Sequence, residues 1–182
     1  MERWLAASVA MPQPLSRALG IATFTLLMVL SAYLALPLPF TPVPITLQTL
    51  VVLISAGMLG RWAAVSQALY LALGAIGLPV FAGAWGGLAR MCGPTGGYLS
   101  GFVLTAYFVG WSLERGRRRL IRTLLAMVLG ASAILLLGTL RLAFLFRLNF
   151  AQAAGLGCWP FAAIEMIKAV AAAALVNGYR RP

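Results

Sequence analysis

Residues 93–99 have the sequence Gly-Pro-Thr-Gly-Gly-Tyr-Leu and separate two long apolar runs. Glycine has no Cβ and tolerates positive φ angles, and proline fixes its own φ, so this segment favours a shaped turn. Two interpretations remain open. In the first, Thr95 is the N-cap of a helix that packs closely through Gly93, Gly97 and Gly101 at four-residue spacing. In the second, the segment is a loop at a membrane surface that approaches another group closely.

The composition around this segment is that of a membrane protein. Hydrophobic residues make up 62% of the 182 residues and charged residues 9%. A soluble domain typically has about 25% charged residues, so this chain has too few to cover a surface in water. The sequence therefore predicts an all-α integral membrane protein. Because a spanning helix needs roughly 20 apolar residues, the length accommodates about six transmembrane helices and no substantial soluble domain.

The apolar runs predict one domain, 1–182, with six helices. Their approximate bounds are 18–36, 45–59, 62–78, 95–113, 123–140 and 159–176. Residues 1–16 are expected to form a short interfacial segment. A cleaved signal peptide is an alternative for the first run, but about 19 apolar residues exceed the usual signal core of 7 to 15.

Two connections between these helices have unusual compositions. Four prolines within residues 37–44 forbid a regular helix and favour an extended, polyproline-like loop. Residues 79–87 form a glycine-rich loop that is too apolar for a solvated linker, so we expect it to pack against the helices as a lid or pocket wall. In that loop Trp85 could also be an interfacial anchor.

The distribution of basic residues predicts the orientation. Six helices place both termini on one side of the membrane. With the termini cytoplasmic, ten basic residues lie inside and three outside. The inner ones are Arg3, Arg17, Arg61, Arg115, Arg117, Arg118, Arg119, Arg122, Arg180 and Arg181, and the outer ones are Arg90, Arg141 and Arg147. The positive-inside rule therefore predicts cytoplasmic termini and places the proline-rich and glycine-rich loops on the external face.

The remaining composition argues against other classes of protein. The net charge of +11 is concentrated at helix ends, without the interleaved basic and aromatic residues of a nucleic-acid groove. Cys92 and Cys158 lack metal-ligand spacing, although a disulfide between them stays open. With three acidic residues and no histidine, the chain has little to support catalysis, so we expect no enzyme, no metal and no cofactor.

Two ionisable residues interrupt the sixth apolar run. Glu165 and Lys168 are three residues apart and so share one helix face. Each ionised group costs roughly 2.5 to 3.5 kcal/mol at a helix centre. One interpretation is an ion pair, either mutual or with a neighbouring helix. The other is a polar cavity in which Glu165 accepts and Lys168 donates hydrogen bonds to a neutral group that carries both N–H and C=O, such as a urea or amide.

Other residues complete a candidate pocket on the outer side. Arg90 supplies a fork suited to a carboxylate, or alternatively snorkels to the interface. Phe81, Trp85 and Tyr98 would enclose an apolar body. Gln48 needs a partner inside the membrane, which could also be a neighbouring helix. These residues together predict a small amphipathic acid with an amide-like head as the solute.

Four segments resemble those of a known family. They are PVPITLQTL at 42–50, GLPVFAG at 77–83, GPTGGYLSGF at 93–102, and Pro160-Phe161 followed by Glu165 and Lys168. In this order and spacing they resemble the BioY family, the biotin-binding S components of energy-coupling factor (ECF) transporters. The resemblance covers roughly residues 18–178.

The resemblance implies a substrate-binding subunit in the bacterial cytoplasmic membrane that has no ATPase activity of its own. Such a subunit captures biotin at the external face and works with a transmembrane coupling (T) protein and ABC-type ATPase subunits; self-association is left open. Glu165 and Lys168 would hold the ureido ring and Arg90 the carboxylate. Gly97 and Tyr98 would form one wall of the pocket.

The chain departs from the family pattern at two places. It has Ile164-Glu165 where members usually have Gly-Asp, so the acid is one methylene longer. A small-residue pattern on the first helix is expected to contact the coupling protein, and here Ala18 and Ala22 have that spacing. Two other functions remain as alternatives: a transporter subunit for another vitamin or amphipathic carboxylate, and a self-sufficient secondary transporter or channel, which an internal inverted repeat would support.

Overall fold

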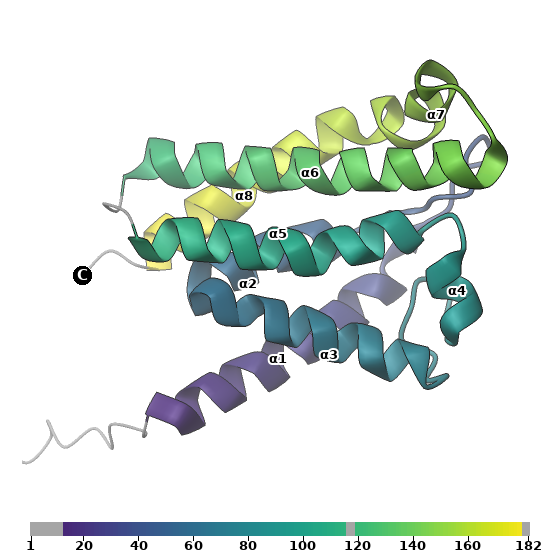
Figure 1. Cartoon of the computed structure of the whole chain (residues 1–182). Coiled ribbons are helices and arrows are strands. Elements are labelled where there is room, and N and C mark those ends of the chain that lie inside the picture. The colour runs from purple at the N-terminus through teal and green to yellow at the C-terminus, as the bar shows by residue number, and fades with distance from the viewer. Residues whose placement is uncertain (1–12, 116–118, 180–182) are drawn as a thin grey trace, which may run out of the picture.

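The computed structural model describes residues 13–115 and 119–179, which form a helical bundle with one short two-stranded ribbon (Figure 1). The elements in chain order are α1 (Gln13–Tyr33), β1 (Ala35–Leu36), β2 (Ile45–Thr46), α2 (Gln48–Leu59), the 3-10 helix η1 (Gly60–Trp62), α3 (Ala63–Ala75), α4 (Leu88–Cys92), α5 (Gly96–Arg115), α6 (Leu120–Phe146), α7 (Phe150–Gly157) and α8 (Trp159–Tyr179). Most of the predicted interfacial segment lies outside the described residues, as do Arg3, Arg117, Arg118, Arg180 and Arg181.

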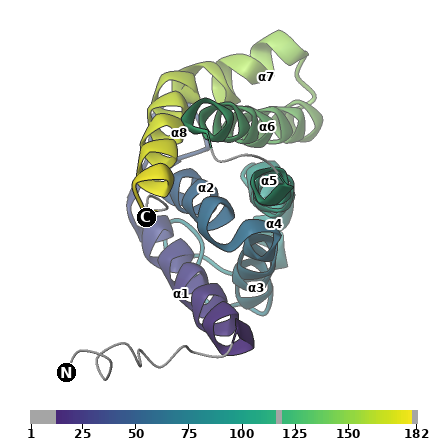
Figure 2. The same cartoon turned by 90° about the vertical axis from the view of Figure 1, so that its left-hand side faces the viewer.

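Helix α2 lies at the centre of the bundle. Viewed end-on, it is surrounded by α1, α3, α5 and α8 (Figure 2). The chain reverses direction at Gly60, whose φ of 62° is a conformation that glycine adopts without strain. As a result α2 and α3 run antiparallel. Two side-chain hydrogen bonds join them, from Gln67 Nε2 to Ser55 Oγ at 3.2 Å and from Gln48 Nε2 to Tyr70 Oη at 2.7 Å.

The outer surface of the bundle is suited to lipid. Four helical stretches in the described part of the chain are long and apolar enough to cross a membrane: α1, α6, α8 and Gln48–Ala75. The last of these turns back at Gly60, so its length is divided between α2 and α3. Large apolar side chains are also widely exposed, as at Leu129 (69%) and Phe144 (78%). Such a surface would aggregate in water. The predicted all-α membrane protein is thus confirmed, while the six-helix count and the orientation stay predictions.

The structure differs from the sequence prediction between residues 141 and 157. Helix α6 begins at Leu120 and continues to Phe146, past the predicted end near residue 140, and α7 follows where a loop was expected. Arg141 lies within α6, and its guanidinium donates a hydrogen bond to the Cys92 carbonyl beyond α4. The helix ends at Arg147, whose φ is 51°. The capping box of Asn149 and Gln152 then starts α7.

The two unusual loops lie at the same end of the bundle, together with α4 and α7 (Figure 1). The proline-rich loop is closed by antiparallel pairing of β1 with β2, in which Ala35 faces Thr46 and Leu36 faces Ile45. The glycine-rich loop is closed by a bridge between Phe81 and Trp85. Each loop therefore has a defined shape.

The packing interpretation of the glycine stretch applies to Gly97 and Gly101 at the contact between α5 and α6, but not to Gly93, which precedes α5 and lies against α4. A Cβ on Gly97 would collide with the Leu137 carbonyl, and one on Gly101 would lie 3.2 Å from the Cα of Ile134. Thr95 directly precedes α5. Small residues therefore let the two helices approach closely.

Candidate binding site

A cavity lies between the start of α2, the glycine-rich loop, α5, α6 and α8. It encloses about 600 Å³ of space, its open mouth included. Five predicted site residues line it: Gln48, Phe81, Arg90, Tyr98 and Glu165. Segments 117 residues apart in the sequence thus meet at one cavity.

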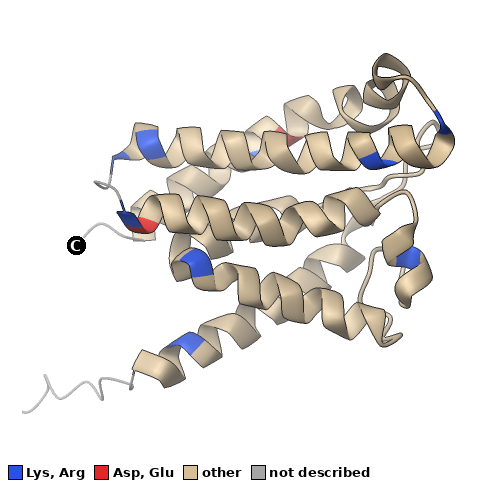
Figure 3. Cartoon of the chain, viewed as in Figure 1, with Lys and Arg blue, Asp and Glu red and all other residues tan. Residues whose placement is uncertain are grey.

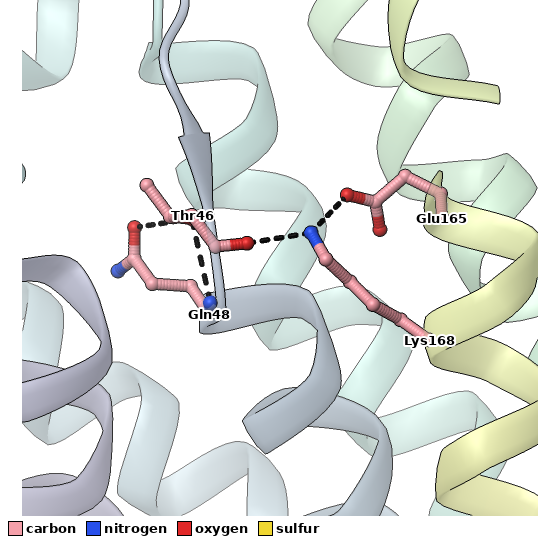
Figure 4. A network of polar contacts seen from close by, with 4 residues as sticks. All are labelled: Thr46, Gln48, Glu165 and Lys168. Carbon is pink, nitrogen blue, oxygen red and sulfur yellow. Dashed lines mark hydrogen bonds and ion pairs between the residues drawn. The ribbon is translucent and has the colours of Figure 1, made fainter. Parts of the chain in front are cut away.

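The polar end of the cavity is built on a buried ion pair. Lys168 Nζ lies 2.6 Å from Glu165 Oε1, and the side chains are 5% and 8% exposed. The same ammonium donates a 2.5 Å hydrogen bond to the Thr46 carbonyl, which ties α8 to the ribbon in front of α2 (Figure 4). The mutual ion pair considered from the sequence is therefore present. Glu165 also lines the cavity and Lys168 does not, so the ion pair leaves only Glu165 available to contact a solute there, and that contact stays a prediction.

Glu165 retains an unused acceptor. Its Oε2 is buried and has no hydrogen-bond partner among the described residues. A carboxylate oxygen without a donor is costly to bury, since its hydration is not replaced. The cavity wall therefore presents an acceptor that an N–H group of a bound solute would satisfy.

Gln48 is held in place by a residue that sequence analysis missed. Its Nε2 donates to Tyr70 Oη at 2.7 Å, and Tyr70 in turn donates to the Val80 carbonyl at 3.2 Å. The Gln48 backbone N–H and side-chain oxygen both contact Thr46 Oγ1 (Figure 4). Tyr70 is completely buried in an apolar helix, where its hydroxyl needs a hydrogen-bond partner. A tyrosine inside an apolar run was therefore the feature of the sequence that could have pointed to this contact.

Aromatic side chains form the apolar wall. Phe81 contacts the Tyr70 ring edge-on, with 5.5 Å between the ring centroids, and is 2% exposed. Tyr98 donates from its hydroxyl to the Gly157 carbonyl at 2.6 Å. Phe102 and Phe161 also line the cavity and are buried. These rings are fixed by packing and hydrogen bonds, so the wall is preformed.

A second hollow extends the cavity toward the loops. It shares Pro44, Ala82 and Arg90 with the inner cavity and is also lined by Trp85, which is 60% exposed. Arg90 thus lies where the two hollows meet. Among residues 13–115 and 119–179, no carboxylate lies within 4.0 Å of its guanidinium. An anionic group entering from the loops would find this cation without a competing partner.

Three predicted site residues lie off the wall of the inner cavity. Lys168 lies behind Glu165, and Trp85 lines the outer hollow instead. A Cβ on Gly97 would point at the α6 backbone, which accounts for a packing role, and Gly97 does not line the inner cavity. In the described residues there is no group of three or more His, Cys, Asp and Glu that could hold a metal ion, and Cys92 and Cys158 are free thiols.

The chain matches one family model over nearly its whole length. The model is described as the BioY family and covers residues 6–182. Among curated relatives, a biotin transporter BioY of Thermotoga maritima is 40% identical over 82% of this chain and 87% of its own length. A probable biotin transporter BioY of Bacillus subtilis is 35% identical over 85% of each chain.

The fold has a counterpart among solved structures. The crystal structure of the S-component for biotin from an ECF-type ABC transporter superposes with a TM-score of 0.87 and 27% sequence identity. The match covers 93% of each chain.

Proposed function

The chain belongs to the BioY family, and we propose that it is the biotin-binding S component of an ECF-type uptake transporter. It is a transport subunit and not an enzyme. The observation that carries the proposal is the buried Glu165–Lys168 pair at the end of a preformed cavity, with one carboxylate oxygen free.

Biotin matches the chemistry of this cavity from one end to the other. Its ureido group offers two N–H donors and one carbonyl acceptor. Glu165 Oε2 accepts from a ureido N–H. Lys168 has used two of its three N–H donors on Glu165 and Thr46. Because Lys168 lies behind Glu165 and off the cavity wall, its main role is to orient the Glu165 carboxylate toward the ligand.

The rest of the ligand lies toward the loops. The apolar bicycle packs between Phe81 and Tyr98, and the valerate tail extends outward. Its carboxylate pairs with Arg90 at the junction of the two hollows. Trp85 covers the tail from the outer hollow. Gln48, anchored by Tyr70, supports the ureido end of the wall.

The arrangement in the membrane follows from the same proposal. Helices α1, α2, α3, α5, α6 and α8 make up the six spans, in the bacterial cytoplasmic membrane with both termini inside. The cavity then opens to the external face. Ala18 and Ala22 are exposed on α1, where a transmembrane coupling protein could pack against them, and ATPase subunits supply the energy.

Equilibrium binding of tracer biotin to the purified, detergent-solubilised chain tests the proposal. The parent protein should show saturable binding, which Glu165→Ala and Lys168→Ala should remove. Glu114→Ala is a matched control, because Glu114 also lies in an ion pair but is 36% exposed and far from the cavity. An absence of saturable binding in the parent, or equal binding in all the variants, would refute the proposal.

A further inference from the structure

The paired helices α5 and α6 form an apolar groove that is separate from the two hollows described above and shares no lining residue with the binding cavity. It is lined by Leu104, Phe108 and Ser112 of α5 and by Ala126, Leu129 and Ala133 of α6. Its volume is about 590 Å³, the open side included. At the floor, Thr105 Oγ1 donates to the Gly130 carbonyl at 3.2 Å, so the Thr105 hydroxyl is satisfied internally. The groove is therefore suited to a hydrocarbon chain.

One end of this groove is strongly basic. Arg122 lies one helical turn before Ala126 and donates to the carbonyl of Ser112 at 2.7 Å, which places its guanidinium beside that end of the groove. Arg115 and Arg119 lie at the same end, where basic residues cluster in the charge view (Figure 3). The acid at this end, Glu114, is already paired with Arg61. A net positive charge therefore remains at the mouth of the groove.

A tryptophan marks the depth of this end in the membrane. The Arg115 guanidinium lies 4.2 Å from the centre of the Trp111 ring. Tryptophan is enriched at the level of the lipid headgroups, and arginines beside it interact with phosphates. Leu104 to Ser112 extends about 12 Å from this level toward the middle of the membrane. The groove thus begins at headgroup depth and continues along the acyl-chain region.

We infer that the α5–α6 groove binds one anionic phospholipid, with an acyl chain along Phe108 and Ala133 and the phosphate at Arg122. Charge complementarity selects this occupant over a zwitterionic lipid. It also selects against a second copy of the chain, because a copy in the same orientation would bring its own arginines to the same membrane face, where like charges repel. The site does not depend on what the cavity binds.

Native mass spectrometry of the delipidated full chain with added phosphatidylglycerol or phosphatidylcholine tests this inference. We expect one phosphatidylglycerol to bind at least 10-fold more tightly than phosphatidylcholine. Ala133→Phe should fill the groove and remove the bound lipid. Arg122→Gln should reduce the preference for phosphatidylglycerol to less than 3-fold.

Two matched controls keep the test specific. Ala174→Phe places the same ring on the exposed surface of α8, and Arg147→Gln removes a charge at the opposite end of α6; both should keep the bound lipid. A circular dichroism melt of each variant verifies that it is folded. Equal binding of both lipids, lipid retained by folded Ala133→Phe, or a dimer that only Ala133→Phe disrupts would each overturn the inference.

Discussion

Two ion pairs, one within the bundle at the middle of α8 and one at the end of α5, differ in almost every respect. The Glu165–Lys168 pair beside the cavity has an N–O distance of 2.6 Å, with side chains that are 8% and 5% exposed. The Glu114–Arg61 pair joins the end of α5 to the turn between α2 and α3, with a distance of 3.7 Å and side chains that are 36% and 54% exposed. The same two kinds of charge therefore experience very different surroundings.

The difference shows what each pair contributes. Buried charges cost several kcal/mol each to desolvate, and their attraction rarely makes them better than apolar residues of the same size. An exposed pair costs little and contributes about 0 to 1 kcal/mol. The exposed pair needs no explanation beyond local structure. In the buried pair, Glu165 Oε2 has no hydrogen-bond partner among the described residues, and this cost in stability is what the proposed binding of a ligand would offset.

The largest expected effect comes from neutralising the buried acid. Glu165→Gln keeps the size of the side chain, but it replaces one of the two carboxylate acceptors by an NH2 donor and leaves Lys168 without its counter-charge. We expect biotin binding to weaken by about 100-fold or more. The measurement is a tracer-binding isotherm. Glu114→Gln should stay within about 2-fold of the parent, and a similar loss in both variants would remove the distinction between the two pairs.

The next largest effect is expected on the stability of the fold, from a substitution at the contact between α5 and α6. In Gly97→Ala the new Cβ meets the Leu137 carbonyl of α6, so we expect a loss of about 1 to 3 kcal/mol in a thermal or denaturant melt. Gly155→Ala is the matched control, because a Cβ there meets nothing within 4 Å. If the two variants melt alike, Gly97 has no packing role.

Arg90→Gln should weaken the binding of biotin by about 10- to 100-fold, since a charge-assisted hydrogen bond contributes about 1.5 to 3 kcal/mol. The uncharged amide of biotin should bind the parent and the variant equally, because it offers no carboxylate. Competition against tracer biotin measures the affinity of the parent and of the variant for biotin and for its amide. A loss that is the same for the acid and the amide would place Arg90 outside carboxylate recognition.

Cysteine labelling reports which end of the bundle faces outward. Cys92 is exposed beside the mouth of the cavity, whereas burial raises the pKa of the Cys158 thiol and lowers its thiolate fraction at neutral pH. A membrane-impermeant maleimide added to intact cells should therefore modify Cys92 about 10-fold faster than Cys158. Protection of Cys92 until the cells are opened would reverse the predicted orientation.

The smallest effect belongs to the exposed pair. Arg61→Gln should lower stability by less than about 1 kcal/mol, and the difference should disappear at high salt because exposed charges are screened. Melts at low and high salt measure it. A larger loss that does not depend on salt would mean that Arg61 contributes through packing on the turn.

The sequence alone predicted most of the fold and part of the candidate site. Long apolar runs identified the membrane class because charged residues are excluded from lipid whatever the tertiary arrangement. Glu165 and Lys168 stood out for the same reason. The extent of α6 was not predictable from the sequence, in which an arginine at position 141 indicates the end of a membrane helix. In the structure the Arg141 guanidinium donates to the Cys92 carbonyl, which is 49 residues away in the sequence.

What the sequence by itself determined is therefore the class of protein, the resemblance to the BioY family and the residues that are costly in a membrane. Only the tertiary structure decided which of them meet. It placed Glu165 on the cavity wall with Lys168 behind it, brought Thr46 and Tyr70 into the polar network, and turned Gly97 toward α6. The physical reason is that the cost of burying a group depends on the group itself, whereas its partner depends on how distant helices pack.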